Sequence, residues 1–110
     1  MKRSKLVVFA NATEGSDTEF NQWYDEIHLG EVLAIPGFVG AERLELSDVQ
    51  VAPEDRPHRY LAIYEIEGDP QAALDALLAA SSTMNMSITL SDDAATSLYT
   101  QITPRVTAKA

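Results

Sequence analysis

Residues 11–40 read NATEGSDTEFNQWYDEIHLGEVLAIPGFVG. This segment contains the only tryptophan, Trp23, and one of the two histidines, His28. If it is helical, Tyr24 and His28 are neighbours on one side of the helix, because residues four apart lie one above the other. This pair is the candidate site.

The segment predicts an amphipathic helix. Ser16 lies three residues before Glu19, which is the spacing of a capping box and marks a helix start. At roughly 100° per residue, the apolar side chains gather in one arc that should face the core. They are Phe20, Trp23, Tyr24 and Ile27. The stop comes at Pro36 and Gly37, because proline lacks a backbone donor and glycine permits a positive φ.

Leu29 does not fit this helix, because it falls on the side opposite the core arc. Either the regular helix ends near His28 and Gly30 starts a new turn, or Leu29 meets a partner chain. Gly30 favours the first interpretation, since glycine weakens a helix interior by about 1 kcal/mol relative to alanine.

The remaining sequence predicts four strands and a second helix. Apolar runs and alternating patterns predict strands at residues 6–10, 39–47, 59–66 and 97–106, the first of them buried on both faces. Asp69 as N-cap and Pro70 at the first helical position start the second helix. Residues 81–96 show no sustained period, so we expect an irregular connection that covers or shapes something.

The order of these elements is strand, helix, strand, strand, helix, strand. It predicts an α+β, ferredoxin-like βαββαβ fold, in which a four-stranded antiparallel sheet carries both helices on one face. At 110 residues we expect a single domain spanning residues 1–110. The uncovered face also carries apolar residues, and a second subunit is its simplest cover, so we expect a two-fold homodimer.

Composition excludes several classes of function. The net charge of −9, with only eight lysines and arginines, argues against a nucleic-acid partner. No run approaches the roughly 18 apolar residues of a membrane span, and the short run 6–10 after a basic start is expected to be a strand, not a signal peptide. The absence of cysteine excludes disulfides and thiol chemistry. We expect a cytoplasmic protein.

No motif for a bound metal or cofactor is present. The two histidines are far apart, and Asp92 and Asp93 lack the further spaced oxygens of a calcium loop. There is no G-x-G-x-x-G, no P-loop and no G-x-S-x-G. We therefore expect neither a metal nor a cofactor.

A set of residues in the first half of the chain resembles a known family. The set is Asn11, Trp23, Tyr24, His28, Pro36, Gly37, Phe38 and Arg43. It is similar to the pattern of the dimeric α+β barrel superfamily, and within it of the EthD-like group, where a strand ends in Asn, a helix bears W-Y-x-x-x-H, and an I-P-G-F turn leads into a strand with an Arg. The likeness covers roughly residues 6–46, and Gly30 departs from it where such proteins often carry proline.

The resemblance implies that two sheets pair as a dimeric α+β barrel. Members of the superfamily include polyketide cyclases, dehydratases, isomerases and monooxygenases that act on aromatic or polycyclic molecules without a cofactor. Others accompany cytochrome oxidation systems, and many have no assigned activity. Fold alone does not settle function.

The candidate catalytic residues are His28, Tyr24 and Asn11. His28 can accept or donate a proton at neutral pH, Tyr24 can hold an enol or carbonyl oxygen, and Asn11 can donate its amide to developing negative charge. The alternative for His28 is that it caps a carbonyl or pairs with Glu31. Trp23 either offers a flat wall to an aromatic ring or simply fills the core.

Further candidates for substrate contact come from other elements. Arg43 either binds an acidic group of the substrate or pairs with a surface carboxylate. Met84 and Met86 either line a pocket or fill gaps in the core. Phe38 and Tyr64 are the remaining candidates for contact with the substrate.

Two functions follow from these residues. The first is a cofactor-independent enzyme of the cyclase, dehydratase (lyase) or isomerase type, acting on a hydrophobic aromatic or polycyclic carbonyl compound with His28 as general acid or base. The second is a non-catalytic small-ligand-binding or accessory protein of a catabolic pathway, in which the same pocket binds without chemistry.

Overall fold

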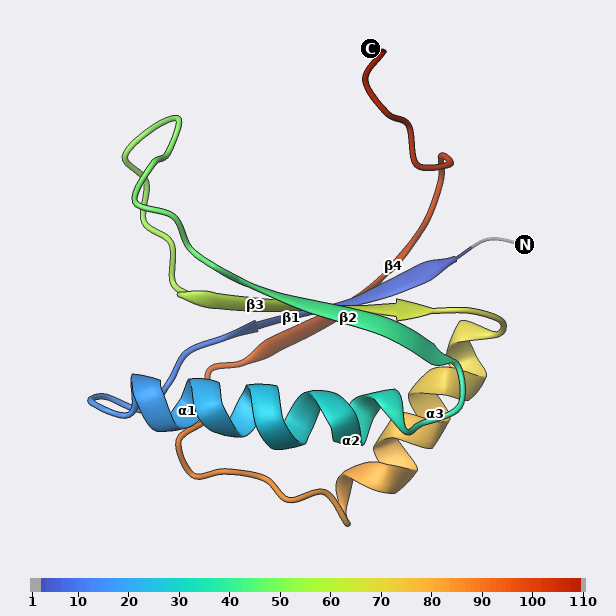
Figure 1. Cartoon of the computed structure of the whole chain (residues 1–110), viewed down its shortest axis with the longest axis horizontal. Helices are drawn as coiled ribbons and strands as arrows, with labels where there is room; N and C mark the ends of the chain where they lie inside the picture. The colour runs from blue at the N-terminus through green and yellow to red at the C-terminus, as the bar shows by residue number, and fades with distance from the viewer. Residues whose placement is uncertain (1–2, 110) are drawn as a thin grey trace.

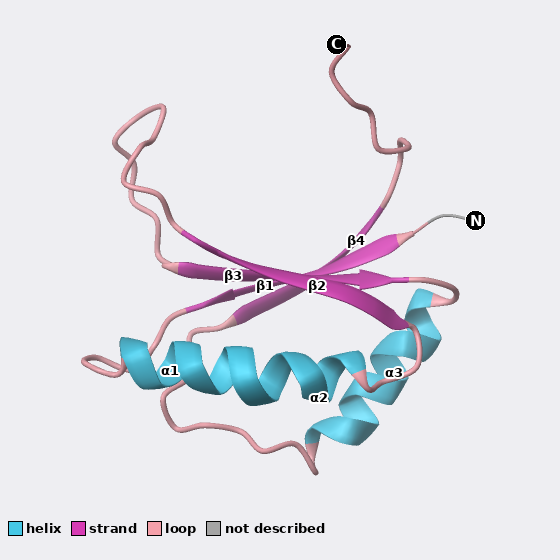
Figure 2. Ribbon diagram, viewed as in Figure 1, coloured by secondary structure: helices cyan, strands magenta, loops and turns pink. Residues whose placement is uncertain are grey.

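The structure is a computed structural model that describes residues 3–109, and it shows an antiparallel sheet with the helices on one face (Figure 1, Figure 2). The strands are β1 Ser4–Ala10, β2 Phe38–Glu45, β3 Tyr60–Ile66 and β4 Ala95–Thr100. The first helix runs through α1 Asp17–Trp23, the π-helical turn η1 Tyr24–His28 and α2 Leu29–Leu33, and the second helix is α3 Pro70–Ser81. The predicted ferredoxin-like βαββαβ fold is confirmed.

The core lies between the sheet and the helices. The strand order is β2-β3-β1-β4, and the register places Leu6 of the central strand β1 opposite Tyr64 and Leu98 on its two neighbours. Side chains on the face toward the helices, the inner face, are buried. They include Leu6, Ala10, Tyr60, Ala62, Tyr64 and Ile66. Phe20 of α1 packs on this face, with its ring centroid 5.2 Å from that of Tyr60.

The opposite, outer face of the sheet is open. Val7, Leu61 and Ile63 are half-buried there, and Phe9 is 38% exposed. The prediction that the first strand is buried on both faces is therefore wrong for the single chain, because the helices all lie on the inner side (Figure 1). β4 ends at Thr100 instead of continuing to residue 106, since its pairing with β1 stops where β1 begins.

The first helix contains one π-turn that changes which residues face the core. The Leu29 N–H donates to the Tyr24 carbonyl, five residues back, and the helix continues through Gly30 to Leu33. The extra residue in the turn rotates the side chains within the turn and after it around the axis. Ile27 is therefore 38% exposed, while Leu29 packs against the core. The predicted break at Gly30 and the predicted burial of Ile27 are both wrong for this reason.

The ends of the first helix are held by backbone geometry. Ser16 occupies the N-cap, but its side chain makes no capping hydrogen bond, so the predicted capping box does not form. Gly37 follows the helix with φ of 98°, and a Cβ there would lie 3.2 Å from the Cβ of Ala73. Glycine at this position lets the chain turn tightly under α3 and enter β2.

Within residues 3–109, none of the helices has the length and apolar character needed to cross a membrane.

Candidate functional site

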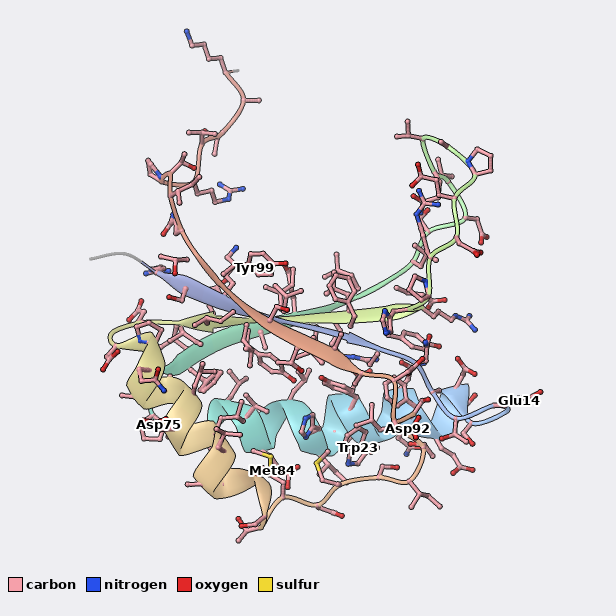
Figure 3. The ribbon with its side chains drawn as sticks, turned by 180° about the vertical axis from the view of Figure 1, so that it is seen from behind. Glu14, Trp23, Asp75, Met84, Asp92 and Tyr99 are labelled. Atoms are coloured by element: carbon pink, nitrogen blue, oxygen red, sulfur yellow. The ribbon has the colours of Figure 1, made fainter. Side chains whose placement is uncertain are left out.

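A cavity of about 360 Å³ lies between the inner face of the sheet, the helices and the segment before β4. Its walls are mainly apolar. They include Leu6, Val8, Val32, Leu77, Met84, Met86 and Leu90. Figure 3 shows Met84 and Trp23 on the helix side of the sheet and Tyr99 on the opposite side. The cavity thus lies on the helix side of the sheet and is separate from the outer face.

Two tyrosines form a hydrogen-bonded pair in the wall of this cavity. The Tyr64 hydroxyl on β3 donates to the Tyr24 hydroxyl on η1 over 3.0 Å. Burial raises the pKa of both phenols, and Arg43 opposes part of this shift. Both hydroxyls therefore stay protonated at neutral pH. Because Tyr24 accepts from Tyr64, its own proton is available to a ligand oxygen in the cavity.

His28 lines the same cavity, one turn after Tyr24. Its ring meets Tyr24 edge to face at 4.9 Å and stacks on Trp23 at 4.7 Å with an angle of 20°. Nδ1 lies 3.4 Å from the Glu31 Oε1, and the His28 side chain is 13% exposed. Burial lowers the pKa of His28, although the Glu31 carboxylate opposes this. The imidazole is consequently neutral at pH 7 and can act as a base.

Trp23 and Phe38 support the cavity from outside its wall and do not line it. Trp23 is buried, and its Nε1 donates to the carbonyl of Asn85 over 2.7 Å. Phe38 is also buried and meets the ring of Tyr64 edge to face at 6.2 Å. Both aromatic rings therefore position a cavity residue, since Trp23 backs His28 and Phe38 backs Tyr64. The two methionines, in contrast, line the cavity directly.

Arg43 follows the second of the two alternatives, pairing with a surface carboxylate. Its Nη1 donates to Asp25 Oδ1 over 2.7 Å, and its Nη2 donates to Asn21 Oδ1 over 2.8 Å. The guanidinium carbon lies 4.5 Å from the centre of the Tyr24 ring. Arg43 thus packs behind Tyr24 and does not line the cavity, whose walls contain no lysine or arginine.

Asn11 holds loops together at the end of β1. Its Nδ2 donates to the Pro57 carbonyl over 2.6 Å and to Asp93 Oδ2 over 2.9 Å, while its Oδ1 accepts from the Arg59 N–H over 2.8 Å. Each polar atom of the amide is already engaged. The structure therefore does not bring Asn11 into the cavity with Tyr24 and His28.

Sequence reasoning missed most of the apolar walls. Val32 could have been found, because it continues the four-residue spacing of Tyr24 and His28 along the helix. Leu6 and Val8 carried no such signal, since alternation along a strand does not say what lies above it. No group of three or more His, Cys, Asp or Glu side chains within residues 3–109 is placed to hold a metal.

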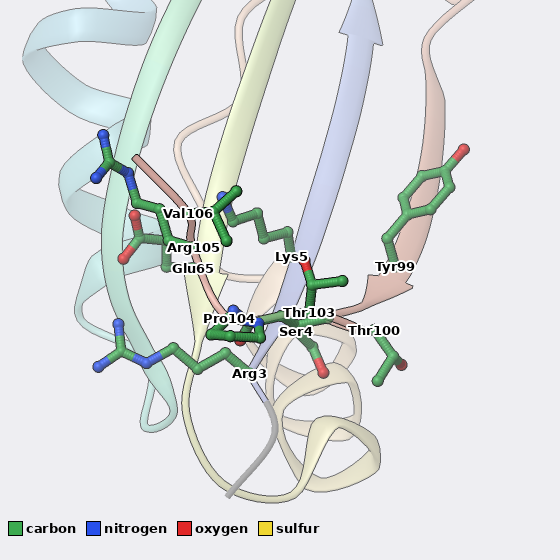
Figure 4. Close-up of a pocket in the computed structure, with 11 residues that line it drawn as sticks. Arg3, Ser4, Lys5, Glu65, Tyr99, Thr100, Thr103, Pro104, Arg105 and Val106 are labelled. Atoms are coloured by element: carbon green, nitrogen blue, oxygen red, sulfur yellow. The ribbon is translucent and has the colours of Figure 1, made fainter. Parts of the chain in front are cut away.

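A second hollow of about 440 Å³ lies on the other side of the sheet (Figure 4). Arg3, Lys5, Glu65 and Arg105 surround it, and the segment after β4 forms part of its wall. It lies on the open face and contains no histidine. The cavity on the helix side of the sheet is the better candidate for chemistry, because its wall combines the neutral imidazole of His28 with the hydroxyl donor of Tyr24.

The ferredoxin-like fold of this chain is similar to that of several solved structures, which match most of its length. SnoaB from Streptomyces nogalater, described as a cofactor-independent oxygenase, matches with a TM-score of 0.60 and 16% identity, covering 99% of this chain and 100% of that chain. An EthD family protein from Bacillus halodurans matches with a TM-score of 0.59 and 12% identity, covering 89% and 96%.

A third structure is described as a dimeric ferredoxin-like protein of unknown function from Thermobifida fusca. It matches with a TM-score of 0.56 and 10% identity, covering 91% of this chain and 92% of that chain. No protein-family model and no curated protein matches the sequence. The predicted resemblance is confirmed at the level of the fold.

Proposed function

We propose that this chain is a cofactor-independent enzyme that moves protons on a hydrophobic aromatic or polycyclic carbonyl compound, with His28 as general acid and base. The observation that carries the proposal is a neutral imidazole and a tyrosine hydroxyl that share one otherwise apolar cavity of about 360 Å³. Ligand sites are typically of this size and are mostly apolar with a few convergent polar groups.

The proposed step begins at the carbon next to a carbonyl group. With Nδ1 facing Glu31, Nε2 of His28 takes a proton from that carbon. The electron pair of the C–H bond forms a C=C bond to the carbonyl carbon, and the π pair of the C=O bond moves onto the oxygen. The resulting enolate accepts a hydrogen bond from the Tyr24 hydroxyl, which Tyr64 polarises. Returning the proton to another carbon isomerises the substrate, and giving it to a leaving hydroxyl releases water.

The ligand is expected to be uncharged. No lysine or arginine lines the cavity, and Arg43 is already bound to Asp25 and Asn21. A ligand carboxylate would therefore lose its hydration without gaining a counterion, at a cost that apolar contacts do not offset. This supports a neutral ketone or phenol over an acid.

A second candidate is oxygenation. SnoaB is described as a cofactor-independent oxygenase. An enolate of an aromatic ketone is electron-rich enough to react with dioxygen directly, so the same first step, proton removal by His28, serves this reaction. Comparing turnover in air and under argon separates the two, because isomerisation and dehydration consume no oxygen.

The test is hydrogen–deuterium exchange at the activated methylene of 2-tetralone, a bicyclic aromatic ketone, followed by NMR in D₂O. Wild type is expected to exchange this methylene, and His28→Gln to lose at least about a hundredfold in rate, the lower end for general acid–base catalysis. His58→Gln is the matched control, because His58 lies in a loop away from the cavity and bonds the Asp93 carbonyl. Equal exchange in wild type and His28→Gln would refute the proposal.

The non-catalytic alternative makes a different prediction in the same experiment. Trp23 is the only tryptophan and stacks on His28, so its fluorescence reports occupation of the cavity. A change in that fluorescence with 2-tetralone, with no exchange in any variant, identifies a binding or accessory protein.

We also propose that the open face pairs with a second copy of the chain. Val7, Phe9, Leu61 and Ile63 form a continuous apolar strip on β1 and β3. Paired sheets bury such a strip, and the Thermobifida fusca neighbour is described as dimeric. The mass in solution tests this pairing.

A further inference from the structure

Residues 82–94, which we call the strap, connect α3 to β4 on the helix side of the sheet (Figure 1). Met84, Met86, Leu90 and Ala94 line the cavity from the strap. The strap contains no helix. Its second half is fixed to the segment after β1, where the Thr13 N–H donates to the Thr89 carbonyl over 2.6 Å and the Ser91 N–H donates to the Asn11 carbonyl over 2.9 Å. Its first half, around Asn85, is held over the cavity by hydrogen bonds to the first helix.

Asn85 of the strap is held at both of its backbone polar groups. Its N–H donates to Glu31 Oε2 over 2.6 Å, and its carbonyl accepts from Trp23 Nε1 over 2.7 Å. Glu31 and Trp23 are also the two side chains that flank His28, one facing Nδ1 at 3.4 Å and the other stacked on the ring at 4.7 Å. The strap and the imidazole are thus joined through two shared partners.

The Glu31 carboxylate is the charged member of this arrangement. Oε1 faces the imidazole while Oε2 is bound to the strap, so the two contacts fix the orientation of the carboxylate. A carboxylate beside Nδ1 favours the tautomer with the proton on Nδ1, which leaves the lone pair on Nε2. The other titratable groups around the ring, Tyr24 on η1 and Tyr64 on β3, are neutral phenols.

We propose that Glu31 is a positioning residue for His28 and that the strap controls it. Glu31 and Trp23 hold the imidazole in its working tautomer while Asn85 lies over the cavity, and they are released when the first half of the strap, around Asn85, lifts. Access to the cavity and the state of the base are then coupled. This deepens the proposed function, since it describes regulation of the same site, but its main test needs no substrate.

The turn at Asn85 allows a selective substitution. The Met86 N–H donates to the Met84 carbonyl over 3.0 Å, which makes a tight turn centred on Asn85, and no residue other than glycine in the described chain has a positive φ. Proline fits an inverse turn of this kind because its φ is fixed near −65°. Asn85→Pro thus removes the N–H that binds Glu31, whereas Asn85→Ala keeps it.

The experiment is an NMR titration of the full chain with ¹⁵N-labelled histidine, which follows the imidazole of His28 directly. Glu31→Gln is expected to lower the pKa of His28, because it removes the carboxylate that raises this pKa, and to reduce the share of the Nδ1–H tautomer. Asn85→Ala should match wild type. The shift caused by Glu31→Gln should be smaller in an Asn85→Pro background than in an Asn85→Ala background.

Two results would overturn the proposal: an unchanged His28 titration in Glu31→Gln, or equal Glu31→Gln shifts in the two Asn85 backgrounds. If Asn85→Pro does not fold, Trp23→Phe replaces it, because phenylalanine keeps a ring against His28 but cannot donate to Asn85. The same reduction of the shift is expected in that background, and an undiminished shift there would equally overturn the proposal.

Exchange of 2-tetralone provides the functional readout. Glu31→Gln should lower kcat by about ten- to a hundredfold with little change in KM, by analogy with carboxylates that orient metal-bound histidines. A shifted titration combined with exchange that does not need His28 would reject the proposed function and support the positioning role. An unshifted titration in Glu31→Gln, combined with exchange that is lost in His28→Gln, would support the proposed function and reject the positioning role.

Discussion

The inner and outer faces of the sheet are built from the same strands and have similar apolar side chains, yet they differ in what covers them. On β3, Tyr64 and Ile66 point inward and are at most 1% exposed, whereas Leu61 and Ile63 point outward and remain half-buried. Alternation sorts the residues between faces, but burial depends on the helices and the strap. A pattern of alternating residues therefore identifies the two faces without saying which one is closed.

The polar groups differ between the two faces as well. The inner face has uncharged groups, the hydroxyls of Tyr24 and Tyr64, next to a neutral imidazole. The outer face carries charges at its edges, such as Lys5 and Glu65, around an apolar strip. Chemistry at low dielectric is favoured inside, and association with another apolar surface is favoured outside.

The largest contrast is expected from two phenylalanines. Phe20→Ala removes a ring that is fully buried on the inner side and should cost about 3–5 kcal/mol of unfolding free energy. Phe9→Ala, at 38% exposure on the outer face, should cost clearly less when the chain is monomeric. Urea unfolding at low protein concentration measures both. Equal costs under those conditions would mean that the outer face is already covered within one chain.

A charge on the outer face should break the dimer. Ile63→Asp buries a carboxylate without a partner in each copy, which should weaken pairing by at least about 3 kcal/mol, or more than a hundredfold in Kd. Light scattering after size exclusion measures the mass. Ile88→Asp is the matched control, because Ile88 is 95% exposed and belongs to the strap, a segment that does not contribute to the apolar strip on β1 and β3. A dimer that survives Ile63→Asp would place the interface elsewhere.

The tyrosine pair tests the polar part of the inner face. Tyr24→Phe leaves the Tyr64 hydroxyl without its acceptor in an apolar cavity and should cost about 1–3 kcal/mol. Tyr64→Phe should cost less, because the Tyr24 hydroxyl keeps its donor proton and can turn to another acceptor. Thermal unfolding of the two variants compares them directly. The reverse order would show that Tyr24, and not Tyr64, is the donor of this bond.

The smallest expected effect is a pH dependence from His28. Its pKa is lowered in the folded chain because burial disfavours the imidazolium. As the pH falls below about 6.5, the pKa of the imidazole in the unfolded chain, the unfolded chain takes up the proton first. The contribution of neutral His28 to the free energy of unfolding is therefore fully present above this pH and is lost as the pH falls below it. The difference between wild type and His28→Gln should therefore change between pH 8 and pH 5. A constant difference would mean that His28 is solvated.

Much of the fold could be predicted from the sequence, because local patterns carry it. The alternation in residues 60–66 and the Asp69–Pro70 start of α3 depend on neighbours in the chain. Asp69 accepts from the Gln71 N–H, only two residues away. The spacing of Tyr24 and His28 likewise survives the π-turn, since both line the cavity.

The π-turn itself could not be predicted. Whether the Leu29 N–H bonds four or five residues back depends on which side chain can pack on the sheet, and that choice moved Ile27 outward and Leu29 inward. The role of Asn11 in joining two loops could not be predicted for a related reason. Its partners lie 46 and 82 residues away, in loops whose paths no local pattern describes.

The sequence by itself determined the order of the elements, the faces of the strands and the pairing of an imidazole with a tyrosine along one helix, because these follow from the 2.0 and 3.6 residue periods of the backbone. Only the tertiary structure decided which face is closed, how the helix turns at η1, and that Asn85 meets Glu31 from 54 residues away. Such contacts depend on how the chain folds back, which no local period encodes.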